Sequence, residues 1–395
     1  MGIQLYDVLP GRPFGRGTVQ STISSDPNTR TYATSSGANI TLGSAILSNG
    51  DLAVIHQSYG ASGISDPNWE PFVVSSGGGT TSIVAESALS RTYSSGAQVL
   101  KVPEYLDLTV NSAFGGHSYG ATVASSTRNA YGGINVIAVR NKLTLNAVIN
   151  QNGYQGYISN SDRGGIDEWT HFKWWYDNAP SGGHIGGANS TDASQSAVGG
   201  NSLYGYNGTE SRTPIWNGGA GATNAGCGSG GGNAAAGSNG TDSNSGSGGA
   251  LAGNTSLTSI HFGGGGGGTA GSSSGGGIWT GGSGGGIWII YAREVAFGPS
   301  GGIQVNGGLS YGNNGHAGGS GAGGSVLINC ERGDFGTNLI TATPGATNNH
   351  GGSGSNGRIR LNYGMTLSGT TNPSASVVQD TKLIEPTAAA IFFFG

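Results

Sequence analysis

A short aromatic segment, Ile166-Asp-Glu-Trp-Thr-His-Phe-Lys-Trp-Trp-Tyr-Asp177, interrupts a chain dominated by glycine, serine and asparagine. Its candidate ligand-binding residues are Trp169, Phe172, Trp174, Trp175, Tyr176 and Asp177. Aromatic rings pack against the apolar faces of sugars, so these residues together could form a glycan-binding patch. The alternative is that the same rings cover an exposed end of the fold or seal a subunit interface.

The carboxylates of this segment raise the question of glycoside hydrolysis. Asp167, Glu168 and Asp177 all lie within it. That reaction needs two carboxyl groups about 5 to 9.5 Å apart, one of them with a raised pKa. Adjacent carboxylates on a polar loop usually face water instead, and the sequence has neither a nucleophile elbow nor a cysteine–histidine pair. We therefore expect no enzymatic activity and assign no catalytic residue.

The histidines and cysteines lack the short spacings of metal ligands. There is no H-x-x-x-H pair, and the one E-x-x-H, Glu168 to His171, would share a face only on a helix. Cys227 and Cys330 are too few for a disulfide framework, although a single bridge between them is left open. We expect no metal site and no cofactor.

Composition excludes two classes of partner. Charged residues make up 9% of the 395 residues and the formal net charge is -4, so no basic face is available for nucleic acid. No apolar run approaches the roughly 20 residues of a membrane helix. The first residues lack the basic and apolar regions of a secretory signal, so a role outside the cell would imply release by lysis or a leaderless route.

Most of the 81 glycines lie between residues 182 and 357, including six in a row at 263–268. Such composition is typical of disorder, but the tracts are followed by short apolar runs at 287–291, 303–305, 325–329 and 358–361, which are typical of strands. We therefore expect an ordered scaffold. Polyglycine can adopt the polyproline II conformation, in which helices without side chains pack closely, if a rigid frame offsets the entropy cost.

The N-terminal part predicts a β module. Short apolar segments at 40–42, 51–56, 71–74, 81–85, 98–102 and 105–110 are separated by turn-forming residues. Residues 1–38 are polar and rich in turns, with little regular structure expected, and resemble an attachment arm. We found no segment with helical apolar spacing.

An internal repeat follows the β module. Residues 132–145 with 147–153 match 285–297 with 302–308, and a looser copy runs from 323–335 to 339–343. Each copy reads as Gly-Gly, a buried strand, a polar corner and further short strands. Three strands per unit with glycine corners are what a coil of a β-helix or β-solenoid needs.

The order of these motifs resembles a widespread group of glycine-rich β proteins of bacteria and phages, many of them surface or tail-fibre-like. The resemblance covers about residues 40–375, from Asp51-Leu-Ala-Val-Ile-His-Gln57 through Gly357-Arg-Ile-Arg-Leu361 to Ser368-Gly-Thr-Thr-Asn-Pro373. The glycine tracts are also similar to those of phage tail-fibre tip adhesins, whose polyglycine helices form a sandwich that displays variable loops. The resemblance implies a structural or adhesive role and supplies no catalytic residues.

These observations predict an all-β protein, a glycine-rich solenoid or sandwich, with packed polyglycine helices as an option. We expect an arm at 1–38, a β module at 39–115, a repeat domain at 116–365 with the insert 166–177, and a tail at 366–395. The tail ends in an apolar run suited to assembly, Ile391, Phe392, Phe393 and Phe394.

The expected function is a virion or cell-surface protein, foremost a phage fibre adhesin that contacts host-surface glycan. The expected partners are further copies of the chain, as a trimer or polymer, and other virion or surface proteins. The alternative is a bacterial or archaeal surface filament subunit that polymerises through its ends, and a polysaccharide-active enzyme is a third interpretation. The missing signal peptide favours the virion.

Overall fold

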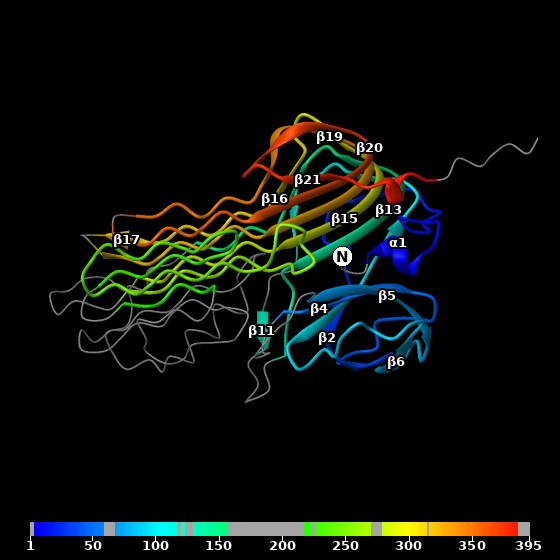
Figure 1. The fold of residues 1–395 in the computed structure, drawn as a ribbon, viewed down its shortest axis with the longest axis horizontal. Helices are drawn as coiled ribbons and strands as arrows, with labels where there is room; N and C mark the ends of the chain where they lie inside the picture. Colours follow the sequence, from blue (N-terminus) through cyan, green and yellow to red (C-terminus); the bar gives the residue numbers. More distant parts are fainter. Residues whose placement is uncertain are drawn as a thin grey trace, which may run out of the picture.

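A computed structural model describes residues 4–58, 68–116, 120–122, 129–155, 217–222, 226–269, 279–313, 316–348 and 350–385. The described chain is almost entirely β, as expected: its helical elements are the short α1 (Leu5–Val8) and the 3-10 turn η1 (Thr381–Leu383). Figure 1 shows three parts, a barrel, a curved sheet packed beside it, and extended glycine-rich segments that project from the curved sheet to one side. No described helix is long and apolar enough to cross a membrane.

The barrel closes in the strand order β2-β3-β6-β5-β4-β7. Its strands are β2 (Arg30–Ser36), β3 (Asn39–Leu42), β4 (Leu52–Gln57), β5 (Trp69–Ser76), β6 (Ser82–Ala85) and β7 (Ala97–Lys101). Five of these coincide with predicted segments. The sequence analysis did not anticipate closure, which depends on β2 pairing with β7 across more than sixty residues of chain, Arg30 opposite Leu100.

The second part is an 11-stranded sheet. Its strands are β1 (Ser21–Ile23), β8 (Glu104–Tyr105), β9 (Leu108–Val110), β10 (Phe114–Gly115), β13 (Ile134–Leu145), β14 (Val148–Asn150), β15 (Ile287–Phe297), β16 (Gly302–Gln304), β19 (Ser325–Thr341), β20 (Arg358–Asn372) and β21 (Ser376–Gln379). Two small hairpins lie outside it, β11 (Gly120–Thr122) with β12 (Asn129–Tyr131) and β17 (Gly312–Asn313) with β18 (His316–Ala317).

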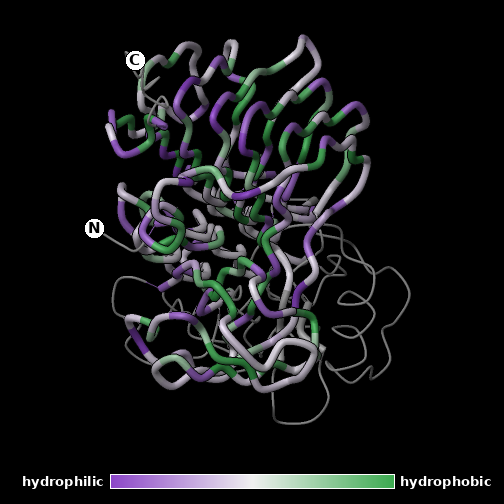
Figure 2. The backbone as a smooth tube through the Cα atoms, turned by 90° about the vertical axis from the view of Figure 1, so that its right-hand side faces the viewer, coloured by the Kyte–Doolittle hydropathy of each residue, from purple (hydrophilic) through white to green (hydrophobic). Residues whose placement is uncertain are grey.

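The internal repeat is confirmed as a structural repeat. Ile134 of β13 lies opposite Ile287 of β15, and Ile287 lies opposite Ser325 of β19. These are the residues that follow the Gly-Gly pair in each copy, so equivalent strands stack in parallel and in register. The fourth strand of the stack, β20, begins opposite Ser325 at Arg358. The strands form one curved sheet, which lies above the barrel in Figure 2.

The first halves of β13, β15 and β19 are buried on both faces, which explains the continuous apolar runs there. Ile137 and Val139 of β13 face a core enclosed by the curling sheet itself. Val136 and Ala138, which alternate with them, face a second core shared with the barrel. The inside of the barrel is a third core.

One expected domain boundary falls in the turn between two paired strands, and another falls within a strand. The boundary at residue 38 lies between β2 and β3, whose pairing places Ser36 opposite Asn39. Upstream of β2, Leu5 and Phe14 are buried, so the described residues from 4 to 38 are not a separate arm. The boundary at residue 365 lies within β20. The attachment arm was predicted because the segment is polar and rich in turns. A few buried apolar residues are nevertheless enough to hold the N-terminal segment on the core.

The two cysteines are free and both are buried. Cys330 packs in the core of the curved sheet, whereas Cys227 lies among the glycine-rich segments. The bridge that the sequence analysis left open is therefore not formed in this structure.

Candidate functional site at the distal end of the glycine lattice

The glycine-rich segments form a body of their own without regular strands. We call this body the glycine lattice; it comprises residues 217–222, 226–252, 263–269, 279–286, 305–311, 317–324, 342–348 and 350–357. Most of these residues are buried although few carry an apolar side chain. Backbone hydrogen bonds between segments that are distant in sequence hold them together.

The hydrogen bonds of segment 317–324 follow a period of three residues. The amides of residues 318, 321 and 324 donate to the carbonyls of residues 311, 308 and 305. The amides of residues 319 and 322 donate to the carbonyls of residues 267 and 264. The amides of residues 320 and 323 donate to the carbonyls of residues 352 and 355. The segment thus bonds to three neighbours in rotation. It runs antiparallel to 305–311 and 263–269 and parallel to 351–357.

Glycine is required in this body because there is no space for a side chain. A Cβ placed on Gly319 would overlap the carbonyl oxygen of Ser229, and one on Gly321 would overlap that of Ser283. Neither residue has the positive φ that would demand glycine for conformational reasons. Ala322, the next residue, does carry a Cβ and is fully buried. Whether a position in the lattice can accommodate a Cβ therefore depends on which neighbouring segment it faces.

Asparagine side chains join the lattice to the β part. Asn233 donates from Nδ2 to the carbonyl of Gly323 at 2.7 Å, close to the start of β19. Asn217 donates from Nδ2 to the carbonyl of Phe262 at 3.1 Å, and Phe262 belongs to the core shared with the barrel. From the same region, Leu257 accepts a 2.9 Å bond from Trp69 Nε1 of the barrel. The proximal end of the lattice is thereby fixed to both β bodies.

At the other, distal end the segments reverse direction. At this end the amides of Ala222, Thr269 and Thr241 donate to the carbonyls of Gly268, Trp279 and His350. Asn313 lies opposite His316 in the hairpin. Figure 1 shows this end farthest from the curved sheet, beside the hairpin β17–β18. Trp279 stacks on Tyr311 there, with ring centroids 5.4 Å apart. Described residues from several segments distant in sequence thus bond to one another at this end of the lattice.

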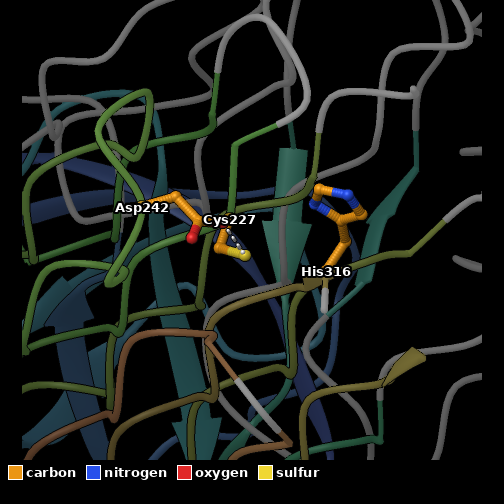
Figure 3. A group of neighbouring side chains, drawn as sticks. All are labelled: Cys227, Asp242 and His316. Carbon is orange, nitrogen blue, oxygen red and sulfur yellow. Dashed lines mark hydrogen bonds between the residues drawn. The ribbon is translucent and has the colours of Figure 1, made fainter. Parts of the chain in front are cut away.

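A cluster of three possible metal ligands lies at the same end (Figure 3). The Sγ of Cys227, a carboxylate oxygen of Asp242 and a ring nitrogen of His316 all lie within 4.8 Å of one another. The thiol donates to Asp242 Oδ2 at 2.9 Å. Burial, reinforced by this hydrogen bond, raises the pKa of Cys227 to about 12.

The sequence-predicted site residues lie elsewhere in the chain. Trp169, Phe172, Trp174, Trp175, Tyr176 and Asp177 are outside the described residues, as are Ile391, Phe392, Phe393 and Phe394. Sequence reasoning missed the Cys227 cluster because its members are 15 and 74 positions apart. No spacing rule could have found them, since only the lattice brings the three segments together.

Comparison with known proteins gives no assignment: no protein-family model, no curated protein and no solved structure matches this chain.

Proposed function

We propose that the glycine lattice is a bundle of polyglycine II helices and that it carries a recognition surface at its distal end. The observation behind this proposal is the three-residue period of the hydrogen bonds donated by segment 317–324. A polyproline II helix has three residues per turn and no internal hydrogen bonds, so its amides point outward in three directions in succession. At about 3.1 Å per residue, such a segment carries the chain roughly 20 Å from the sheet.

A bundle of this kind suits an adhesive protein. Its hydrogen bonds are made by the backbone, so the segments that connect the helices at the distal end can change sequence without altering the frame. Recognition residues are commonly placed on loops that a rigid scaffold positions. We therefore infer a non-enzymatic adhesin of an extracellular assembly, foremost a phage fibre protein whose distal end contacts glycan on a host surface. Further copies of the chain and other virion proteins are its proposed partners.

A binding experiment tests the adhesive role. Fluorescently labelled full-length protein is applied to a panel of bacterial strains and to an array of bacterial surface glycans. We expect binding to a subset of them and a loss of at least about tenfold in affinity for the double variant Trp174→Ala/Trp175→Ala, because stacking on sugar rings would be removed.

The matched control is Val19→Ser, an exposed apolar residue in the β part that is 65% accessible. It should leave binding unchanged. Binding that is lost equally in both variants, or that is absent from every strain and glycan, would contradict the adhesive role.

The edges of the curved sheet favour a second candidate, a filament subunit. Among the described strands, β1 and β10 end the main strand path of this sheet, and β21 pairs only with β20. Val377 and Val378 of β21 are 47% and 39% exposed. An open apolar edge is a template for pairing with another chain.

Solution mass separates the two candidates. For an adhesin, we expect the full chain and a chain ending at Asp380 to form the same closed oligomer, because an adhesin would not polymerise through its C-terminal tail. Open polymers of the full chain that disappear on truncation would favour the filament and assign assembly to Ile391 and Phe392–Phe394.

A further inference from the structure

The three side chains of the Cys227 cluster come from three separate segments of the lattice. Cys227 lies on 226–233, Asp242 at the reversal between 237–241 and 245–252, and His316 on β18. Figure 3 shows Cys227 between the other two. A sulfur, a carboxylate and an imidazole converge at a place where the surrounding chain is mostly glycine, serine and alanine.

Hydrogen bonds donated by backbone amides hold these segments in place. The amide of Gly228, next to Cys227, donates to the carbonyl of Ala317, next to His316, at 3.0 Å. The Oγ of Ser245 accepts from the amides of both Cys227 and Asp242, each at 3.2 Å. The backbone beside Cys227 is therefore tied to that beside His316 by a backbone bond, and the backbones of Cys227 and Asp242 are tied to each other through the hydroxyl of Ser245.

The imidazole of His316 supplies an independent indication. Its Nδ1 is shielded from solvent and has no hydrogen-bond partner among the described residues. A buried polar atom without a partner is costly, on the order of 1 to 3 kcal/mol, and calls for an explanation such as a bound ion.

We propose that Cys227, Asp242 and His316 bind a divalent transition-metal ion, with Zn²⁺ as the best match. Thiolate and imidazole ligands select zinc over calcium or magnesium, which take oxygen ligands. Zinc bonds of about 2.0 to 2.3 Å place tetrahedral ligand atoms roughly 3.3 to 3.8 Å apart, a separation that atoms within 4.8 Å of one another reach by small side-chain movements. The ion takes the place of the proton that the thiol now shares with Asp242.

A second histidine lies beside the cluster. His350 Nδ1 lies 4.0 Å from Asp242 Oδ1 and 2.8 Å from the hydroxyl of Thr241. It approaches the oxygen of Asp242 that the thiol does not contact, since the thiol donates to Oδ2. Three protein ligands leave one position of a tetrahedral ion open to water or to a donor atom of a bound molecule.

This site ties together three segments that converge at the distal end of the lattice. Its existence does not depend on the adhesive role, because the ion would fasten the segments in any function. The sequence analysis expected no metal, since no short ligand spacing is present, but the lattice supplies the proximity that the sequence spacing lacks.

The test is metal binding by the full-length chain freed of any histidine tag. Protein treated with a chelator is dialysed against Zn²⁺ and the bound metal is measured, and Co²⁺ is added separately to record its absorption spectrum. We expect about one ion per chain, a thiolate-to-cobalt charge-transfer band, and a rise in the thermal unfolding midpoint with Zn²⁺. Cys227→Ser and His316→Gln should each weaken binding by at least about tenfold.

Cys330→Ser is the matched control, because it changes the other cysteine, which is buried in the core of the curved sheet. It should retain both the ion and the charge-transfer band. The proposal is overturned if no stoichiometric Zn²⁺ binds to folded wild-type protein. It is also overturned if folded Cys227→Ser, checked by circular dichroism, binds Zn²⁺ as tightly as wild type.

Discussion

Gly319→Ala is expected to lower the free energy of unfolding by about 3 kcal/mol or more, at the upper end of overpacking effects. The new methyl group would overlap the carbonyl oxygen of Ser229 on a neighbouring segment. That oxygen accepts the amide hydrogen bond of Gly267, so the segment that carries it cannot move aside without breaking the bond. Urea unfolding followed by circular dichroism measures the change.

Gly50→Ala separates packing from backbone conformation. Gly50 lies in the barrel turn with φ of 80° and has nothing within 4 Å of the position of a Cβ. Alanine there should cost only about 1 kcal/mol, the penalty for a left-handed conformation. If Gly319→Ala costs no more than Gly50→Ala, the lattice is looser than the structure indicates and close packing is not the reason for its glycines.

The second large effect is the acid sensitivity that His56 contributes. This side chain of β4 is fully buried, with Nδ1 2.8 Å from Ser58 Oγ and Nε2 3.0 Å from the carbonyl of Ile260. Burial, partly opposed by the bond to Ile260 and assisted by the charge of Arg91, lowers its pKa from 6.5 to about 4. The folded protein therefore holds this imidazole neutral, whereas the unfolded chain protonates it below pH 6.5.

The contribution of His56 to the free energy of unfolding is fully present above pH 6.5. It is lost as the pH falls towards 4, because the unfolded state binds more protons than the folded state between these pH values. From the 2.5-unit difference, we expect His56 to remove about 3 kcal/mol from the free energy of unfolding between pH 7 and pH 4. The measurement is urea unfolding over this pH range, compared with His56→Gln.

The variant His56→Gln carries an amide that can still donate to the carbonyl of Ile260 but does not titrate. Its stability should fall less steeply with acid than that of wild type, by the amount assigned to His56. Carboxylates elsewhere contribute equally to both proteins and cancel in the comparison. Parallel pH profiles for the two proteins would show that the imidazole is protonated in the fold or that its environment is more polar than the structure indicates.

His56 also lies where the barrel meets the rest of the molecule. Asn68 donates to the same carbonyl of Ile260 at 2.8 Å and accepts from the amide of Ile260 at 2.9 Å. These bonds fix the chain between the glycine lattice and the core shared with the curved sheet. Acid that protonates His56 thus acts on the junction that holds the proximal end of the lattice.

The sequence alone determined the local structure of the β part. Short apolar runs bounded by turn residues correctly predicted five barrel strands, because burial of alternate side chains is a local requirement. The repeat predicted which strands are equivalent, and Ile134, Ile287 and Ser325 do stack in register. The apolar runs that follow the glycine tracts were the reason to expect that these tracts are structurally ordered.

Tertiary structure alone decided how these elements close and meet. Barrel closure and the burial of Leu5 and Phe14 depend on contacts between distant segments that carry no local signature. The convergence of Cys227 with Asp242 and His316 depends on hydrogen bonds between glycine-rich segments. The sequence does not distinguish one backbone amide of such a segment from the next. The hydrogen-bond partner of each amide is therefore decided by three-dimensional packing, because the absence of a Cβ leaves space for one particular neighbouring segment.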